Sequence, residues 1–125
     1  MSEKKKILIV EDETLQANAI SEYLIGEGYE VKVANNGQEG LKTLENYTPN
    51  LILMDILMPI MDGIATLKEI KSDPKIKDIP VIVLTNLKTE ETMAEAEKLG
   101  AAGYLFKINF KLEDLLKKVK EIVGN

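Results

Sequence analysis

The sequence contains no cysteine, no histidine and no arginine. Disulfide bonds, zinc sites, thiol nucleophiles and serine–histidine–aspartate triads are therefore excluded. The sixteen basic residues are all lysine and are outnumbered by twenty-one acidic residues, so the formal net charge is −5. Because arginine and an excess of positive charge are the usual means of holding phosphate backbones, we expect no direct binding of nucleic acid. Any metal ion must be held by oxygen ligands, which favour a hard cation.

Long apolar segments are absent as well. No run approaches the roughly 18 residues that predict a membrane span. The first run, Ile7–Val10, is too short for a signal peptide and is followed at once by acidic residues. We therefore expect a cytoplasmic protein that does not insert into membranes. A chain of 125 residues suffices for one compact domain, so we expect a single domain over residues 1–125.

Five segments have the pattern of β-strands. Three of them are short and apolar throughout: Ile7–Val10, Leu51–Met54 and Val81–Leu84. Such runs are typical of strands in the middle of a parallel sheet, where both faces are buried. Tyr29–Ala34 and Gly103–Phe106 carry weaker strand signals, and we expect them at the sheet edges.

Between these strands the apolar spacing changes to that of helices. The first expected helix carries Ala17, Ile20 and Leu24 and stops near Gly26. The second begins with a capping box at Asn36 and Glu39, and the third is capped by Asp62. The fourth covers about Thr89–Leu99, and the fifth has an apolar stripe from Leu112 to Val123. Five successive strand–helix units predict an α/β fold of the flavodoxin-like, doubly wound (βα)5 type. The expected sheet is parallel and five-stranded, in the order 2-1-3-4-5, with helices on both faces.

Polar residues follow the predicted strands at the edge where open α/β sheets bind ligands. Glu11 and Asp12 follow the first strand, Asp55 the third, Thr85 the fourth and Lys107 the fifth. Three neighbouring carboxylates repel one another, and a hydrated Mg²⁺ would relieve this repulsion while keeping waters for an incoming phosphoryl oxygen. Asp55 is the candidate nucleophile for an acyl phosphate, with Thr85 and Lys107 contacting the remaining phosphoryl oxygens. Taken alone, an acidic pair before a helix is more typical of an N-terminal cap.

These residues lie within four motifs that follow one another along the chain. The motifs are ILIVEDE at residues 7–13, LILMDILMPIMDG at 51–63, PVIVLTN at 80–86 and GAAGYLFK at 100–107. Together they resemble the receiver domain of two-component response regulators, with the single-domain chemotaxis and sporulation type nearest in size. The resemblance covers residues 5–123.

The resemblance implies a phosphoacceptor switch of a phosphorelay rather than an enzyme with a separate substrate. Asp55 would receive a phosphoryl group from a sensor histidine kinase or a histidine phosphotransfer protein. The domain would assist its own phosphorylation and dephosphorylation. Mg²⁺, or Mn²⁺ in its place, would be held directly by Asp12 and mostly through water by Glu11, with Asp55 and the backbone carbonyl of Leu57 completing the set of metal-binding residues.

The resemblance also implies an output surface. Thr85 and Tyr104 would couple phosphorylation to the face formed by the fourth helix, the fifth strand and the fifth helix. That face would bind a downstream effector protein. Taken alone, a tyrosine in an edge strand is more typical of plain packing than of a switch.

Some positions depart from the family pattern. Ile108 stands where the family usually has proline after the lysine of the fifth strand, and Asn86 stands where it usually has a small residue. A cis bond before isoleucine would cost roughly 2.5–4 kcal/mol, so we expect a trans bond and a different course of this loop. Leu57 and Leu87 would flank the phosphoryl group without orienting an attacking water, which predicts a long-lived phosphorylated form.

Other interpretations remain open at this point. The chain could be a receiver-like interaction module that works without phosphorylation. The departures at Ile108 and Asn86 favour this, whereas the intact set of site residues argues against it, namely Glu11, Asp12, Asp55, Thr85 and Lys107. It could equally be the receiver domain of a longer regulator or of a hybrid kinase. A flavin or nucleotide binder is disfavoured, because the acidic residues 11–13 occupy the place of a glycine-rich first turn and would repel a phosphate.

Overall fold

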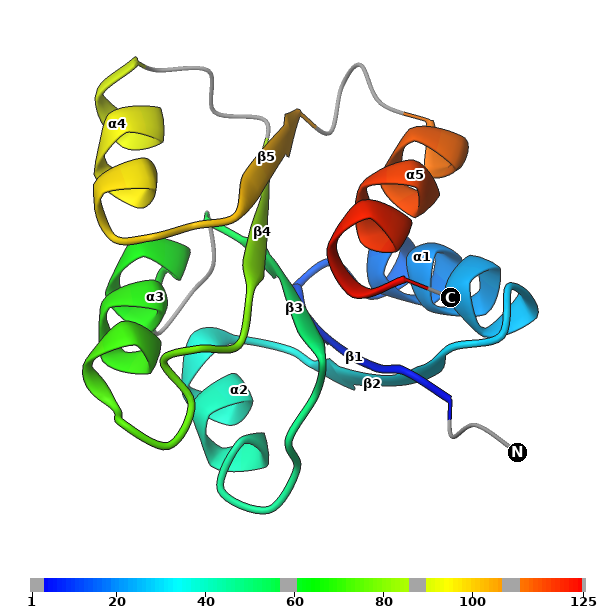
Figure 1. Ribbon diagram of the computed structural model, residues 1–125, viewed down its shortest axis with the longest axis horizontal. Coiled ribbons are helices and arrows are strands. Elements are labelled where there is room, and N and C mark those ends of the chain that lie inside the picture. The colour runs from blue at the N-terminus through cyan, green and yellow to red at the C-terminus, as the bar shows by residue number, and fades with distance from the viewer. Residues whose placement is uncertain (1–3, 57–60, 86–89, 107–110, 125) are drawn as a thin grey trace.

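The computed structural model describes residues 4–56, 61–85, 90–106 and 111–124. Its strands are β1 (Lys6–Val10), β2 (Glu30–Ala34), β3 (Leu51–Asp55), β4 (Val81–Thr85) and β5 (Gly103–Phe106). The helices that follow them are α1 (Thr14–Gly26), α2 (Gly37–Thr43), α3 (Gly63–Ser72), α4 (Glu90–Lys98) and α5 (Leu112–Val123). All neighbouring strands pair in parallel in the order β2-β1-β3-β4-β5, which confirms the predicted fold (Figure 1).

Helices cover both faces of the sheet, with α1 and α5 on one face and α2, α3 and α4 on the other (Figure 1). Successive residues of a strand point to opposite faces. In β1, Ile7 and Ile9 therefore pack against the α1–α5 layer, whereas Leu8 and Val10 pack against the other layer. All four side chains are at most 1% exposed. Because both faces of β1 are covered from Ile7 to Val10, each of these four positions must be apolar, which explains the unbroken apolar run.

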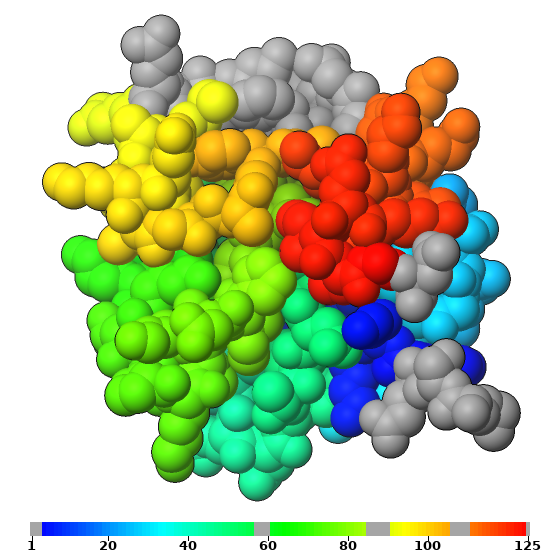
Figure 2. Space-filling model, in the orientation of Figure 1, coloured from blue at the N-terminus to red at the C-terminus, as the bar shows by residue number. Residues whose placement is uncertain are grey.

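The two weaker strand candidates lie at the edges of the sheet, as predicted. Ala34 is the only buried residue of β2, and Val33 is 38% exposed. In β5, residues 103–105 are all partly exposed. On the face shown in Figure 2, β5 (gold) reaches the surface between α4 (yellow) and α5 (red). An edge strand has only one neighbour, so its sequence needs fewer apolar residues.

Side-chain caps mark the predicted starts of two helices. Asn36 Oδ1 accepts the backbone N–H of Glu39 at 2.9 Å, and Asp62 Oδ1 accepts that of Ala65 at 2.8 Å. Both caps are confirmed. The Glu39 carboxylate, however, accepts the N–H of Asn35 at 3.4 Å, one residue before the position that a capping box requires. Of the two hydrogen bonds that define the predicted capping box, only the one accepted by Asn36 is therefore formed.

Glycines in the left-handed region end two of the helices. Gly28 follows α1 with φ of +102°, and Gly100 follows α4 with φ of +95°. Only glycine adopts these angles without strain, so the chain can reverse directly after each helix. Within the described residues, none of the helices has the length and apolar character needed to cross a membrane.

Candidate functional site

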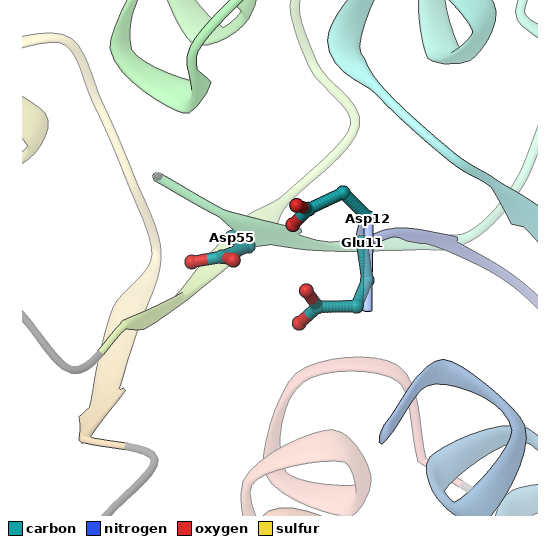
Figure 3. A group of neighbouring side chains, drawn as sticks. All are labelled: Glu11, Asp12 and Asp55. Carbon is teal, nitrogen blue, oxygen red and sulfur yellow. The ribbon is translucent and has the colours of Figure 1, made fainter. Parts of the chain in front are cut away.

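Three carboxylates meet at the carboxyl edge of the two central strands. Glu11 and Asp12 follow β1, and Asp55 is the last residue of β3. These strands are adjacent and parallel, with Val10 paired to Met54, so they end at the same edge. One carboxylate oxygen from each residue lies within 4.8 Å of the other two. Figure 3 shows the Glu11 and Asp12 side chains extending toward Asp55.

The cluster is largely withdrawn from solvent. Glu11 is 1% exposed and Asp55 is 4% exposed, while Asp12 is partly exposed. Burying a carboxylate is costly, and placing three together adds mutual repulsion. A divalent cation relieves both costs, and a donor set made only of oxygen suits a hard ion such as Mg²⁺. The residues present therefore fit a divalent cation at this position.

The acidic pair is not simply a helix cap. The residue that caps α1 is Glu13, and its side chain makes no capping hydrogen bond. Glu11 Oε2 accepts the backbone N–H of Glu13 at 3.2 Å, and the Glu11 backbone N–H donates to the carbonyl of Ala34 at 3.0 Å. These two bonds tie Glu11 to the end of β2 and to the residue before α1. Asp12 and Asp55 remain directed into the cluster (Figure 3).

Gly63, the first residue of α3, supports the backbone beneath Asp55. Its N–H donates to the carbonyl of Ile56 at 2.8 Å. A Cβ at this position would collide with the Asp55 carbonyl oxygen and would lie 2.6 Å from Ile56 Cα. Only glycine lets α3 begin so close to the end of β3. Sequence reasoning recognised the Asp62 cap but missed this role, although the adjacent glycine was the available signal.

Thr85 and Tyr104 lie on the two strands beyond β3. Thr85 is the last residue of β4, one position past Leu84, which pairs with Asp55; the Thr85 side chain lies outside what the structure describes. Tyr104 pairs with Val83 and packs against the α2–α3–α4 layer, where its hydroxyl is buried. Burial raises the pKa of Tyr104; at Glu97 of α4 the backbone lowers this pKa and the carboxylate charge raises it, and burial is the largest of the three effects.

The remaining expectations fall on residues outside the described ranges. They concern Lys107 and the Leu57 carbonyl as site groups, and Asn86, Leu87 and Ile108 as departures from the family pattern. All of them stay predictions.

Comparison with known proteins identifies the family. Residues 7–120 match the model of the response regulator receiver domain. The chain is 36% identical over 117 residues to the probable transcriptional regulator ycf29 of Porphyra purpurea, covering 94% of this chain and 56% of ycf29. It therefore spans about half the length of that relative.

Solved structures with the same fold agree. The chemotaxis protein CheY4 of Vibrio cholerae has a TM-score of 0.90 at 31% identity, covering 96% of this chain and 99% of CheY4. The receiver domain of the sensor histidine kinase PA1611 from Pseudomonas aeruginosa has a TM-score of 0.88 at 27% identity, covering 98% of this chain and all of that domain. The structure of the PA1611 domain has a magnesium ion coordinated in its active site cleft. With its fold, its carboxylate cluster and its matched sequence in agreement, this chain belongs to the response regulator receiver domain family.

Proposed function

We propose that this chain is the phosphoacceptor switch of a two-component phosphorelay and that Asp55 is its phosphorylation site. The observation that carries the proposal is the Asp55 carboxylate, 4% exposed at the end of a central strand and clustered with Glu11 and Asp12. Membership of the receiver family supports it. The phosphoryl donor would be a phosphohistidine of a sensor kinase or of a histidine phosphotransfer protein.

In this reaction an Asp55 carboxylate oxygen bonds to phosphorus while the phosphorus–nitrogen bond of the donor breaks. The electron pair of that bond returns to the donor imidazole, and the product on this chain is an acyl phosphate. Thr85 and Lys107 contact the phosphoryl oxygens as their charge develops. The chain thus assists its own phosphorylation, and later its dephosphorylation, without turning over a separate substrate.

Asp12 and Asp55 would ligate Mg²⁺ directly, Glu11 through water, and Leu57 through its backbone carbonyl. Mn²⁺ would substitute, because it also accepts carboxylate and carbonyl oxygens. When bound, the ion offsets the negative charge of the carboxylates and of the phosphoryl group. The all-oxygen cluster and the magnesium-containing PA1611 receiver domain support this assignment.

Phosphorylation would be transmitted through Thr85 and Tyr104 to the surface formed by α4, β5 and α5, where an effector protein binds. Tyr104 suits this role because its strand lies between the two helices of that surface (Figure 2) and its ring reaches the core beneath α4. The phosphoryl group would shift an existing equilibrium between two arrangements of the surface.

The test is intact mass after incubation with acetyl phosphate, with and without Mg²⁺, for the wild type and Asp55→Asn. A single phosphoryl adduct that requires both Mg²⁺ and Asp55 is expected. The same samples are then titrated with beryllium fluoride and Mg²⁺, since some receivers accept phosphoryl groups only from their kinase. Absence of both the adduct and beryllofluoride binding would overturn the proposal in favour of an interaction module.

The lifetime of the adduct tests the environment of the acyl phosphate. If Leu57 and Leu87 shield the phosphorus from water, the adduct should persist, and Leu57→Asn should shorten its life by giving an attacking water a hydrogen-bond partner. Decay of the adduct is followed by mass after removal of the donor. Hydrolysis within seconds in both proteins would contradict the shielding hypothesis and leave the phosphorylation site unaffected.

A further inference from the structure

A groove lies between the carboxyl-terminal ends of α2 and α3, away from the carboxylate cluster. It has a volume of about 540 Å³, and its apolar lining comes from Leu41 and Leu44 at the end of α2 and from Ile76 after α3. A second hollow of about 500 Å³ continues it along α2 and shares Leu41 and Glu45. We call the first hollow the α2–α3 groove.

Acidic side chains border this groove on both sides, one within α3 and the others just past the ends of α2 and α3. Glu45 lines it from the α2 side, Glu69 and Asp73 from the α3 side, and Lys75 is the one cation among its lining residues. Asp73 Oδ1 already accepts the backbone N–H of Lys75 at 2.9 Å. Glu45 and Glu69 are exposed and, within the described ranges, make no ion pair or side-chain hydrogen bond. Two carboxylates are therefore available to a partner beside an apolar floor.

We propose that the α2–α3 groove binds a basic amphipathic segment of a partner protein. An aliphatic or aromatic side chain of that segment fills the space over Leu41, Leu44 and Ile76, because a buried apolar anchor provides most of the affinity in such grooves. Lysine or arginine residues beside the anchor pair with Glu45 and Glu69. Charge complementarity selects a basic segment over an acidic one and disfavours a second copy of this chain, whose net charge is −5.

The position of the groove makes this partner distinct from the phosphoryl donor and from the effector. The first residue of α3, Gly63, contacts the backbone of Asp55, whereas the groove uses the last turn of the same helix. A helix of this length is about 15 Å long. A segment in the groove therefore leaves the carboxylate cluster accessible, and α4, β5 and α5 form a different surface (Figure 1). The proposal does not depend on phosphorylation of Asp55.

The test uses a synthetic helical peptide of leucine and lysine as the probe. A serine–lysine peptide of equal charge and a leucine–glutamate peptide are its controls. Amide chemical shifts of the ¹⁵N-labelled full chain are followed during titration. Shifts centred on residues 38–45 and 69–76 with the leucine–lysine peptide, and much weaker shifts with both controls, are expected.

Paired variants assign the binding to the groove. Glu45→Lys with Glu69→Lys should lower the affinity for the peptide by about tenfold or more, because attraction becomes repulsion at both borders of the groove. Glu45→Gln with Glu69→Gln, which keeps the shape, should weaken it less. The matched control, Glu91→Lys with Glu95→Lys, makes the same charge change on exposed positions of α4. It removes only long-range attraction, so it should change the affinity for the peptide by no more than about twofold.

Several outcomes would overturn the proposal. They are equal weakening by the α4 pair and the groove pair, shifts spread over all acidic surfaces, or equal binding of the leucine–glutamate peptide. Self-association of the chain that is abolished by the groove variants would assign the groove to a second copy instead. Phosphorylation by acetyl phosphate should be unchanged in the groove variants, so a failure here is distinguishable from a failure of the proposed function.

Discussion

The inner strands of the sheet are more deeply buried than its edge strands. Leu53 of β3 is fully buried, whereas Val33 of β2 is 38% exposed. The carboxylate cluster lies at the ends of β1 and β3, which are two of the three inner strands, those with a neighbouring strand on each side and helices on both faces. Residues at the ends of tightly packed strands are held firmly in place. Three carboxylates that repel one another stay close only when they are held in this way.

The largest expected effect is on the free energy of unfolding, and it distinguishes the inner strands from the edge strands. Leu53→Ala should destabilise the protein by about 2–5 kcal/mol, because it leaves a cavity in the fully buried strand beside Asp55. Val33→Ala on β2 should change the free energy of unfolding by about 0.5 kcal/mol or less, since its side chain is partly solvated. Urea denaturation measures both. Similar losses at the two positions would remove the distinction between centre and margin.

The next effect concerns the support of the site. Gly63→Ala should destabilise the protein by about 1–3 kcal/mol, because the new Cβ meets the backbone of Asp55 and Ile56. It should also slow phosphorylation by displacing the Asp55 carboxylate. Gly26→Ala is the control, since a Cβ at Gly26 has no heavy atom within 4 Å, and alanine should be neutral or stabilise α1 by up to about 1 kcal/mol. Unfolding curves and adduct formation are compared for both variants. Unchanged adduct formation in Gly63→Ala would show that α3 does not position the site.

The smallest effect lies at the margin and depends on pH. Tyr47 is 8% exposed, with the ammonium groups of Lys32 and Lys6 at 4.6 and 5.8 Å from the centre of its ring. Burial, and then the charge of Glu30, raises the pKa of Tyr47 to about 12. The unfolded state loses this proton near pH 10 while the folded state retains it, so stability should fall as the pH rises from about 10 to about 12. Tyr47→Phe should show a shallower decline over the same range in thermal unfolding. Parallel declines would assign the loss to the lysines and to the other tyrosines with raised pKa values, Tyr23, Tyr29 and Tyr104.

Much of the fold could be predicted because its determinants are local. Unbroken apolar runs located β1, β3 and β4, and the caps at Asn36 and Asp62 located the starts of α2 and α3. The capping box at Glu39 was only half right, since the reach of a carboxylate depends on the path of the preceding chain. The candidate carboxylates were also identified from sequence, because acidic residues directly after buried strands are unusual in a core.

The sequence by itself determined which segments are strands and helices, which face of each is apolar, and which carboxylates stand at strand ends, since all of these depend on neighbouring residues and on the two periods of regular structure. Only the tertiary structure decided that Glu11, Asp12 and Asp55 meet within 4.8 Å, that Gly63 must lack a side chain beneath Asp55, and that α2 and α3 leave an acidic groove between their ends. These features join residues from different strands and helices. Their distances are set by the order in which the strands pair and by how closely the helices pack on the sheet, and neither is encoded in any one stretch of sequence.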